Sequence, residues 1–310
     1  MSCNFRQDSI IIPHMSLIRE KLLPYPFLYK KYDKVCFLYE EYIRLLPFKY
    51  YHLKALIKKN KRKTILSYPE KPVYYHLLYQ ICHFNGFTIT NKPQKADCFI
   101  HFEDTTYRKY DLVIRKIAEK NRVINYRCWD ISKKKVEKVH KKVFGYNLSI
   151  NPQAHRGNYV RKGNLNTLHD GVVLSYPEEP RKGYVYQRLV NNIKNGEACD
   201  IRLPIFGKTI PFAYLKYRPT ELRFSAKFKR VYIVKPDKVI TNNEYKKILE
   251  LCHKMGLDYG ELDVLRDSDT QKLFIVDVNN TPAGPSLYLP MKEKIRAIWL
   301  MSDAFQQAFL

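Results

Sequence analysis

Residues 256–285 read GLDYGELDVLRDSDTQKLFIVDVNNTPAGP, and this stretch is the most informative part of the sequence. Two runs of alternating residues, 259–266 and 272–279, flank a polar turn, which is the pattern of a β-hairpin. Because side chains alternate between the two faces of a strand, one face of this hairpin collects acidic and amide side chains. The stretch therefore predicts an antiparallel strand pair with a polar face.

The polar face predicts a cation site. A turn centred on Thr270 places Asp263 opposite Asp277 and Glu261 opposite Asn279. Like charges directly across a strand pair destabilise it, so a bound cation is expected to neutralise them. Hard oxygen ligands favour Mg²⁺ or Mn²⁺. A solvated acidic hairpin is the alternative that the pattern leaves open.

The hairpin and the loop that follows it also carry a family resemblance. Asp263, Asp277 and Asn279, followed by the loop 280–285, resemble the metal motif of the ATP-grasp superfamily, in particular D-alanine–D-alanine ligase and the ribosomal-protein glutamate ligases. The resemblance implies that these three residues are the metal ligands, with ATP and Mg²⁺ (or Mn²⁺) as cofactors and two ions expected. Two departures stand out: Asp277 replaces the more common Glu, and Glu261 stands where the D-alanine ligases have Arg.

Three upstream stretches resemble the nucleotide-binding half of the same superfamily. CDIRLPIFG at 199–207 is similar to the D-I-R strand of the glutamate ligases, and 185–192 is similar to the connector between the two subdomains. The strand and loop at 159–171 resemble the phosphate-contacting segment. The resemblance implies catalytic contacts from Arg202, Lys216 and Arg223, and nucleotide contacts from Lys133 (chosen among five nearby lysines), Lys162, Gln187, Leu189, Val190 and Asp200.

The fold class expected from this resemblance is a mixed α+β or α/β ATP-grasp fold. The local patterns agree, with strands alternating with helices at about 72–85, 242–255 and 291–309. Thr241 and Glu244 have capping-box spacing before the second of these helices. The expected organisation is a helical basic extension (1–62), a pre-ATP-grasp α/β domain (63–125), an N-terminal ATP-grasp subdomain (126–190) and a C-terminal subdomain with the metal site (191–310).

The charge of the chain predicts an anionic partner. Its 55 Lys and Arg residues exceed its 30 Asp and Glu residues, which gives a net charge of +25. Such a field attracts nucleotides, nucleic acids, acidic glycans or anionic lipids. Together with 25 Tyr, 16 Phe and 2 Trp residues, it leaves a nucleic-acid-binding protein as an alternative, although no dedicated nucleic-acid partner is expected. The chain has no P-loop, dinucleotide-binding or protein-kinase motif.

These observations lead to an enzyme hypothesis. The expected function is that of an ATP-dependent ligase that joins a carboxylate to an amine through an acyl phosphate; a kinase acting on a sugar or polyol hydroxyl is the alternative. The substrate is expected to be an anionic small molecule, a glycan or a peptide. Seven scattered cysteines without a signal peptide predict a cytoplasmic protein. Residues 1–62 predict either a helical cap or a peripheral membrane contact. The oligomeric state stays open.

Overall fold

The computed structural model describes residues 49–51, 53–55, 62–93, 95–166, 168, 170–225 and 227–310. The chain divides into two units, Met1–Asn60 and Lys61–Leu310. In the first unit, residues 49–51 and 53–55 are helical. Otherwise, the predictions made for residues 1–62, a helical extension and a membrane contact, lie outside the described residues. The site described below lies within the second unit.

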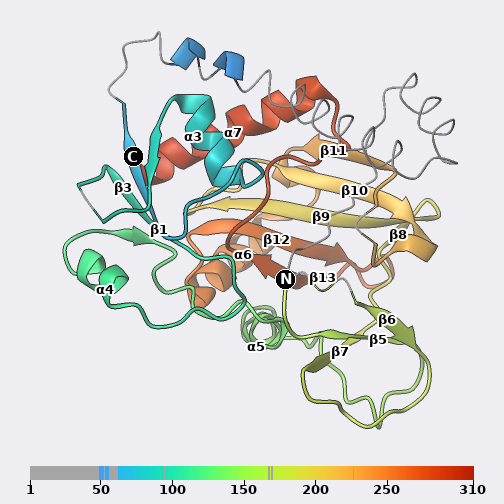
Figure 1. Ribbon diagram of the computed structural model, residues 1–310. Helices are drawn as coiled ribbons and strands as arrows, with labels where there is room; N and C mark the ends of the chain where they lie inside the picture. Colours follow the sequence, from blue (N-terminus) through green and yellow to red (C-terminus); the bar gives the residue numbers. More distant parts are fainter. Residues whose placement is uncertain are drawn as a thin grey trace, which may run out of the picture. The chain divides into compact units, whose positions relative to one another are not determined.

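The second unit begins with a small α/β layer. Its four strands are parallel and lie in the order β2-β1-β3-β4; β1 and β3 are labelled in Figure 1. Ile65, Leu66 and Ile100 are fully buried in this sheet, as expected for a parallel sheet. The bounds are β1 Thr64–Pro69, α3 Leu77–Asn85, β2 Thr88–Thr90, β3 Cys98–Phe102, α4 Leu112–Ala118 and β4 Val123–Ile124.

The first helix of this layer starts later than the sequence predicts. A helix over 72–85 was expected from the proline at its start, but α3 begins at Leu77. His76 forms a backbone bridge with Ala283, and the backbone N–H of Leu77 donates to Pro282 O at 2.8 Å. These contacts with a distant loop hold the preceding residues in a turn, so tertiary pairing overrides helix propensity here.

A helix and a three-stranded antiparallel sheet follow. Helix α5 (Lys133–Phe144) begins at an N-cap Ser132 and ends at Gly145, which adopts the left-handed conformation. The sheet order is β6-β5-β7, so β5 is central. The strands are β5 Tyr159–Gly163, β6 Val172–Leu174 and β7 Tyr184–Arg188.

The largest sheet has six strands and is built around β9 and β12. Its path is β11-β10-β9-β12-β13, with β8 paired to β9. Helix α6 (Asn242–Met255) carries the predicted capping box between Thr241 and Glu244. The short strands β8 and β11 were not predicted. The remaining bounds are β8 Ile193–Lys194, β9 Glu197–Phe206, β10 Ala213–Pro219, the 3-10 helix η1 Thr220–Leu222, β11 Arg230–Val234, the 3-10 helix η2 Pro236–Lys238, β12 Tyr259–Arg266, β13 Leu273–Asn279 and α7 Met291–Phe309.

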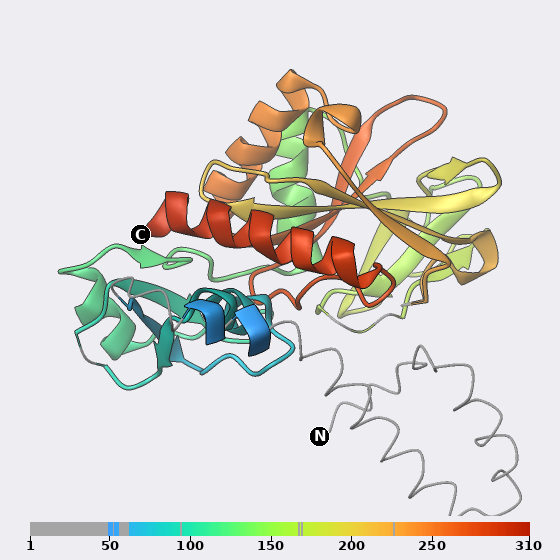
Figure 2. The ribbon, with the colours of Figure 1, turned by 90° about the horizontal axis from the view of Figure 1, so that it is seen from above.

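The two faces of the six-stranded sheet differ in what covers them. Helices α5 and α6 pack on one face, and their apolar side chains form a core with Leu203 of β9 and Leu262 of β12. Helix α7 packs against β9 and α3 (Figure 2). Its Phe305 meets Tyr259 at one end of the other face, with ring centroids 6.3 Å apart. The mixed α+β fold class is thereby confirmed, and the rest of the second face is left to polar side chains.

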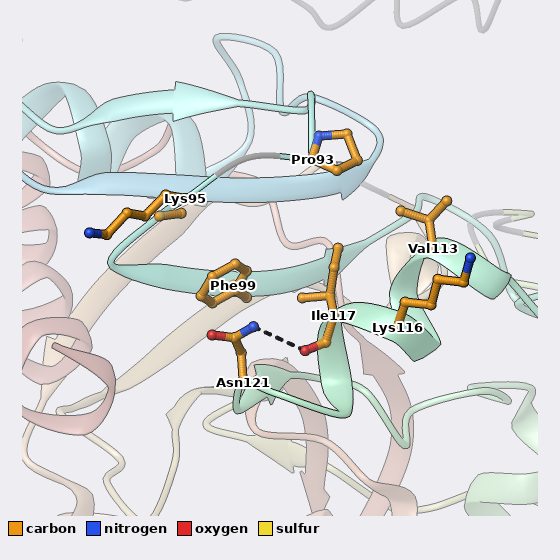
Figure 3. Close-up of a pocket in the computed structure, with 8 residues that line it drawn as sticks. Pro93, Lys95, Phe99, Val113, Lys116, Ile117 and Asn121 are labelled. Atoms are coloured by element: carbon orange, nitrogen blue, oxygen red, sulfur yellow. Dashed lines mark hydrogen bonds between the residues drawn. The ribbon is translucent and has the colours of Figure 1, made fainter.

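Two grooves lie in the small α/β layer. The larger, of about 550 Å³, is lined by Phe99 of β3 and Ile117 of α4 (Figure 3). None of the candidate site residues lines either groove. The candidate site residues lie elsewhere in the fold. Among the described residues, no helix combines the length and apolar character needed to span a membrane.

Candidate active site on the six-stranded sheet

One row of side chains crosses three strands of the six-stranded sheet. Asp263 of β12 lies opposite Asp277 of β13, as predicted, and Glu261 lies opposite Asn279. On its other side, Asp263 lies opposite Arg202 of β9. Residues that are directly opposite each other in a sheet point to the same face, so these side chains share the face that α5 and α6 leave uncovered. We call this the polar face.

A β-bulge lies immediately beside the two aspartates. After Asp263 the pairing shifts by one residue, so that Val264 lies opposite Ile275 instead of Val276. The two predicted pairings lie on the Glu261 side of this shift and are confirmed. Bulges leave one residue without a ladder partner and bend the strand. The carbonyl oxygen of Val276 accepts a hydrogen bond from Lys162 Nζ at 3.3 Å, which links β5 to the β12–β13 hairpin.

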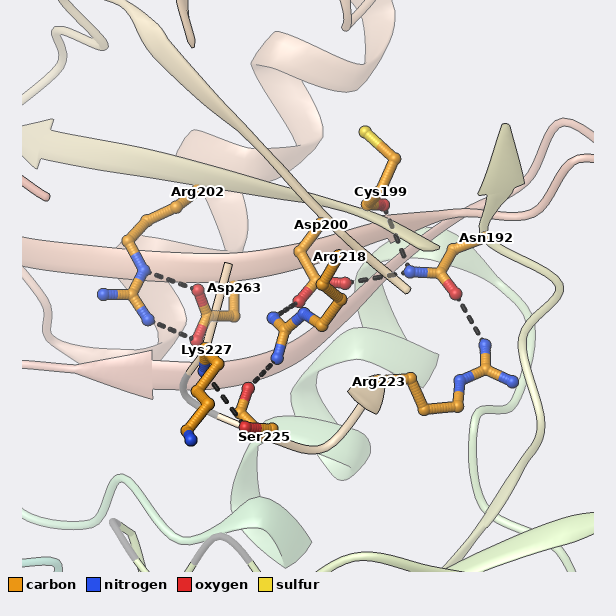
Figure 4. Close-up of polar contacts among 9 residues, drawn as sticks. All are labelled: Asn192, Cys199, Asp200, Arg202, Arg218, Arg223, Ser225, Lys227 and Asp263. Carbon is orange, nitrogen blue, oxygen red and sulfur yellow. Dashed lines mark hydrogen bonds and ion pairs between the residues drawn. The ribbon is translucent and has the colours of Figure 1, made fainter. Parts of the chain in front are cut away.

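Arg202 is the direct partner of the first predicted metal ligand. Its Nε and Nη2 donate to Asp263 Oδ1 and Oδ2 at 2.7 and 2.9 Å, a bidentate ion pair (Figure 4). Its Nη1 also reaches Glu261 Oε2 at 3.4 Å. Burial favours the neutral form of Asp263, but the charge and hydrogen bonds of Arg202 outweigh it and hold the pKa of Asp263 well below its ordinary value. Burial raises the pKa of Glu261, against the charge of Arg202.

The donor set at the predicted metal position consists of oxygen atoms. Asp263 and Asp277 contribute carboxylates, and Asn279 contributes an amide oxygen that also accepts from the backbone of Thr281 at 2.9 Å. Among the described residues, no three His, Cys, Asp or Glu side chains form a cluster that could hold a metal. Two carboxylates and an amide fit Mg²⁺, which commonly takes one or two carboxylates and completes its shell from phosphates and water.

The charges of two lysines act on Asp277: Lys133 at the start of α5 and Lys162 of β5. Lys133 starts α5 and is buried, and its Nζ donates to Leu165 O at 2.6 Å. Burial lowers the pKa of Lys162 to about 8, and the negative charge of Asp277 opposes this effect. The pKa of Asp277 is raised by burial, while Lys133 and Lys162 act to lower it. Lys133, Lys162 and Asp277 therefore form one electrostatic cluster.

The other predicted basic residues occupy two different places. Lys216 of β10 lies on the polar face, where burial, reinforced by the charge of Arg202, lowers its pKa to about 7. Arg223 instead contacts the connector: its Nη2 donates to Val190 O at 3.0 Å and to Asn192 Oδ1 at 2.6 Å. Asn192 in turn donates to Asp200 (Figure 4). The structure thus places Arg223 beside Val190 rather than beside Arg202.

The connector residues lie at the edge of the three-stranded sheet. Gln187 of β7 is buried, and its Nε2 donates to Glu137 Oε1 at 2.6 Å. Burial raises the pKa of Glu137, while this hydrogen bond opposes the rise. Val190 is buried and Leu189 is half-buried. The nucleotide contacts predicted for Gln187, Leu189 and Val190 remain predictions.

Two residues of the site were missed by the sequence reasoning. Arg218 is buried, forms an ion pair with Asp200 and donates to Ser225 O (Figure 4). It follows Lys216 by two positions on β10, so strand alternation could have placed it on the polar face. Glu137 follows Lys133 by four positions, on the buried face of α5, and helical spacing could have identified it.

Comparisons with known proteins find matches among solved structures only. No protein-family model matches the chain, and neither does any of the curated proteins searched. A RiPP-associated ATP-grasp ligase from Chryseobacterium gregarium, solved with ADP and with leader and core peptides, is 13% identical, with a TM-score of 0.44 over 78% of this chain and 95% of that chain. D-alanine–D-alanine ligase from Bacillus anthracis is 12% identical, with a TM-score of 0.43 over 79% of this chain and 95% of that chain.

The ATP-grasp ligase PsnB, solved with a minimal precursor, Mg and ADP, is 13% identical, with a TM-score of 0.42 over 63% of this chain and 65% of that chain. The TM-scores of these three matches are all below 0.5.

Proposed function

We propose that this chain is an ATP-dependent ligase that joins a carboxylate to an amine through an acyl phosphate and requires Mg²⁺. The observation that carries the proposal is the arrangement around Asp277. Oxygen donors from Asp263, Asp277 and Asn279 share one face of the sheet. Lys162 of β5 donates to the backbone of Val276, the neighbour of Asp277 on β13. Carboxylates beside buried lysines suit a metal-bound triphosphate, because each phosphoryl oxygen needs a positive partner.

Each residue of the site would have a separate role in phosphoryl transfer. Asp263, Asp277 and Asn279 would hold Mg²⁺, which when bound neutralises part of the phosphate charge; the same oxygen donors suit Mn²⁺ and would accommodate the expected two ions. Lys133 and Lys162 would contact phosphates from the side of the three-stranded sheet. Lys216, Arg202 and Arg218 project from β9 and β10 on the polar face. They would orient the phosphoryl group and the acyl phosphate.

The proposed chemistry has two balanced steps. A substrate carboxylate oxygen forms a bond to the γ-phosphorus of ATP while the bond to the bridging oxygen of ADP breaks. An amine nitrogen then bonds to the acyl carbon, and phosphate departs with the former carboxylate oxygen while the amine loses a proton. A kinase would release ADP without phosphate. Measuring ADP and phosphate together, with amino acids, glycans and peptides as acceptors, therefore separates the two reactions; peptides are included because ATP-grasp ligases of similar fold were solved with them.

We expect ATP with Mg²⁺ to raise the melting temperature of the wild-type protein, and the Lys162→Met variant to lose most of that rise. Binding to the native state stabilises it by about 2.7 kcal/mol when the ligand is at a hundred times its dissociation constant. Lys162→Met keeps the buried stem but removes the ammonium group that approaches β13. Differential scanning fluorimetry with and without nucleotide measures the rise for each variant against its own unliganded value.

Lys138→Met is the matched control for this test. Lys138 is an exposed residue of α5, so its replacement should leave the nucleotide-dependent rise unchanged. Absence of any rise in the wild-type protein at millimolar ATP and Mg²⁺ would count against an ATP-binding site. An equal rise in Lys162→Met would remove Lys162 from the site.

A further inference from the structure

A buried arginine lies outside the candidate active site, and one edge of its guanidinium group has no hydrogen-bond partner. Arg108 lies in the segment between β3 and α4 and is 7% exposed. Its backbone N–H donates to Trp129 O at 2.8 Å, and its Nη1 donates to Asn125 O at 3.3 Å. The Nε and Nη2 atoms are buried and have no hydrogen-bond partner.

No carboxylate of the described residues forms an ion pair with Arg108. Carboxylates whose charges act on Arg108 have other hydrogen-bond partners: Glu70 Oε2 accepts from the backbone of Asp104 at 3.0 Å, and Asp104 Oδ1 accepts from Thr281 Oγ1 at 2.8 Å. Glu103 lies 3.7 Å from His101 Nε2. Burial lowers the pKa of Arg108, although these carboxylates act against the shift. A buried guanidinium without a paired anion costs several kcal/mol, so the position favours an anionic ligand.

The two unpartnered atoms define the chemistry of that ligand. Nε and Nη2 lie on the same edge of a guanidinium and donate in parallel, which matches the two oxygens of a carboxylate. Arg202 uses these same two atoms to hold both oxygens of Asp263. Arg108 therefore has the same pair of parallel donors that Arg202 uses to bind Asp263, but no protein group accepts from them.

A histidine beside Arg108 can supply another donor. His101 is fully buried on β3, and neither of its ring nitrogens has a hydrogen-bond partner. Burial, reinforced by the charge of Arg108, lowers the pKa of His101 to about 3, so its imidazole is neutral at physiological pH. A neutral imidazole carries one N–H that can donate to an oxyanion without adding a second positive charge.

The place of Arg108 in the fold connects it to the candidate active site. Ligands of open α/β sheets bind beyond the carboxyl ends of parallel strands, which is where the segment after β3 lies. In this segment, Asp104 accepts from Thr281, two residues after Asn279. Thr106 Oγ1 accepts from the backbone of Asn166, in the loop that follows β5. The segment after β3 therefore contacts both the residues that follow β13 and the loop that follows β5.

We propose that Arg108 binds a carboxylate of the enzyme's substrate through Nε and Nη2, with His101 as a second donor. The identity of the ligand as substrate rests on the proposed ligase function, whereas the affinity of the position for a carboxylate does not. In this role the small α/β layer recognises an acidic substrate. The carboxylate of that substrate binds to Nε and Nη2 of Arg108.

The test measures carboxylate binding by the full chain without nucleotide. Melting temperatures are recorded in sodium acetate, sodium succinate, sodium phosphate and sodium chloride at one ionic strength. We expect the two carboxylates to raise the melting temperature above that in chloride, and phosphate to raise it less. In Arg108→Met the carboxylate-specific rise should disappear, and in Arg108→Lys the apparent dissociation constant should rise at least about tenfold, because a lysine loses the bidentate geometry.

Arg266→Met serves as the control for loss of one arginine. Arg266 pairs with Glu244 at 2.6 Å, away from the segment after β3, so this variant should keep the carboxylate-specific rise. In chloride, Arg108→Met should melt no lower than the wild type, because removing an unpaired buried charge does not destabilise the fold. This result shows that a lost rise in Arg108→Met is not a loss of folding.

The outcomes that would overturn the proposal are distinct from failure of the ATP site. It is overturned if acetate and succinate act like chloride in the wild type, if Arg108→Met keeps the rise, or if phosphate gives the larger Arg108-dependent rise. A lower melting temperature of Arg108→Met in chloride would instead assign Arg108 a structural role. Because no nucleotide is present, none of these results depends on Lys162 or Asp277.

Discussion

Asp277→Asn is expected to reduce Mg²⁺-dependent ATP turnover by a factor of about 10²–10³, the loss typical when one preorganised electrostatic group is removed from an active site. The replacement keeps the size of the side chain but removes the charge that would bind the metal. Burial already favours the neutral form of Asp277, whose pKa is raised, so an amide should be tolerated by the fold. Steady-state ADP release against Mg²⁺ concentration measures the effect.

Asp269→Asn is the matched control for this variant. Asp269 lies in the exposed turn of the same hairpin; its carboxylate accepts from Asn191 Nδ2 at 3.0 Å, and its backbone N–H donates to Asp267 Oδ1 at 3.1 Å. Its turnover should equal that of the wild type. Asp263→Asn is a less clean test, because it also breaks the bidentate pair with Arg202. Wild-type turnover by a folded Asp277→Asn protein would exclude the proposed metal site.

Arg218→Met is expected to lower the free energy of unfolding by about 3 kcal/mol, the lower end of the range for removing one partner of a buried ion pair. Arg218 and Asp200 have side-chain exposures of 7% and 19%, so the carboxylate left behind would be buried beside other charges. Arg218 also stacks on Phe228, with its guanidinium 4.2 Å from the ring centroid. Urea denaturation, followed by circular dichroism, measures the change.

Two companion variants make this stability prediction specific. Arg115→Met removes an exposed pair with Glu119, the C-cap residue of α4, and should leave the free energy of unfolding almost unchanged. The double variant Arg218→Met with Asp200→Leu should recover part of the loss, because neither buried charge is left without its partner. If the double variant loses as much as the sum of the two single variants, Arg218 and Asp200 do not stabilise the fold as a pair.

Local patterns in the sequence predicted most of the elements that carry the site. Helix α6 starts at Thr241 with the predicted capping box, and its C-cap Gly256 has a φ of 71°, where glycine is favoured. A Cβ there would also lie 2.4 Å from the Arg127 carbonyl. Hairpin alternation predicted the pairing of Asp263 with Asp277. Each prediction depends on residues close together in the sequence, where spacing fixes geometry.

The sequence by itself determined the mixed α+β class, the hairpin and the set of oxygen-bearing side chains on its polar face, because strand alternation and helix capping act over a few residues. Only the tertiary structure decided the partners of those side chains. Arg202 reaches Asp263 across 61 positions, and Lys162 reaches Val276 across 114 positions. The order of strands in a sheet sets such contacts, and burial then sets the pKa values; neither the order nor the burial follows from spacing along the chain.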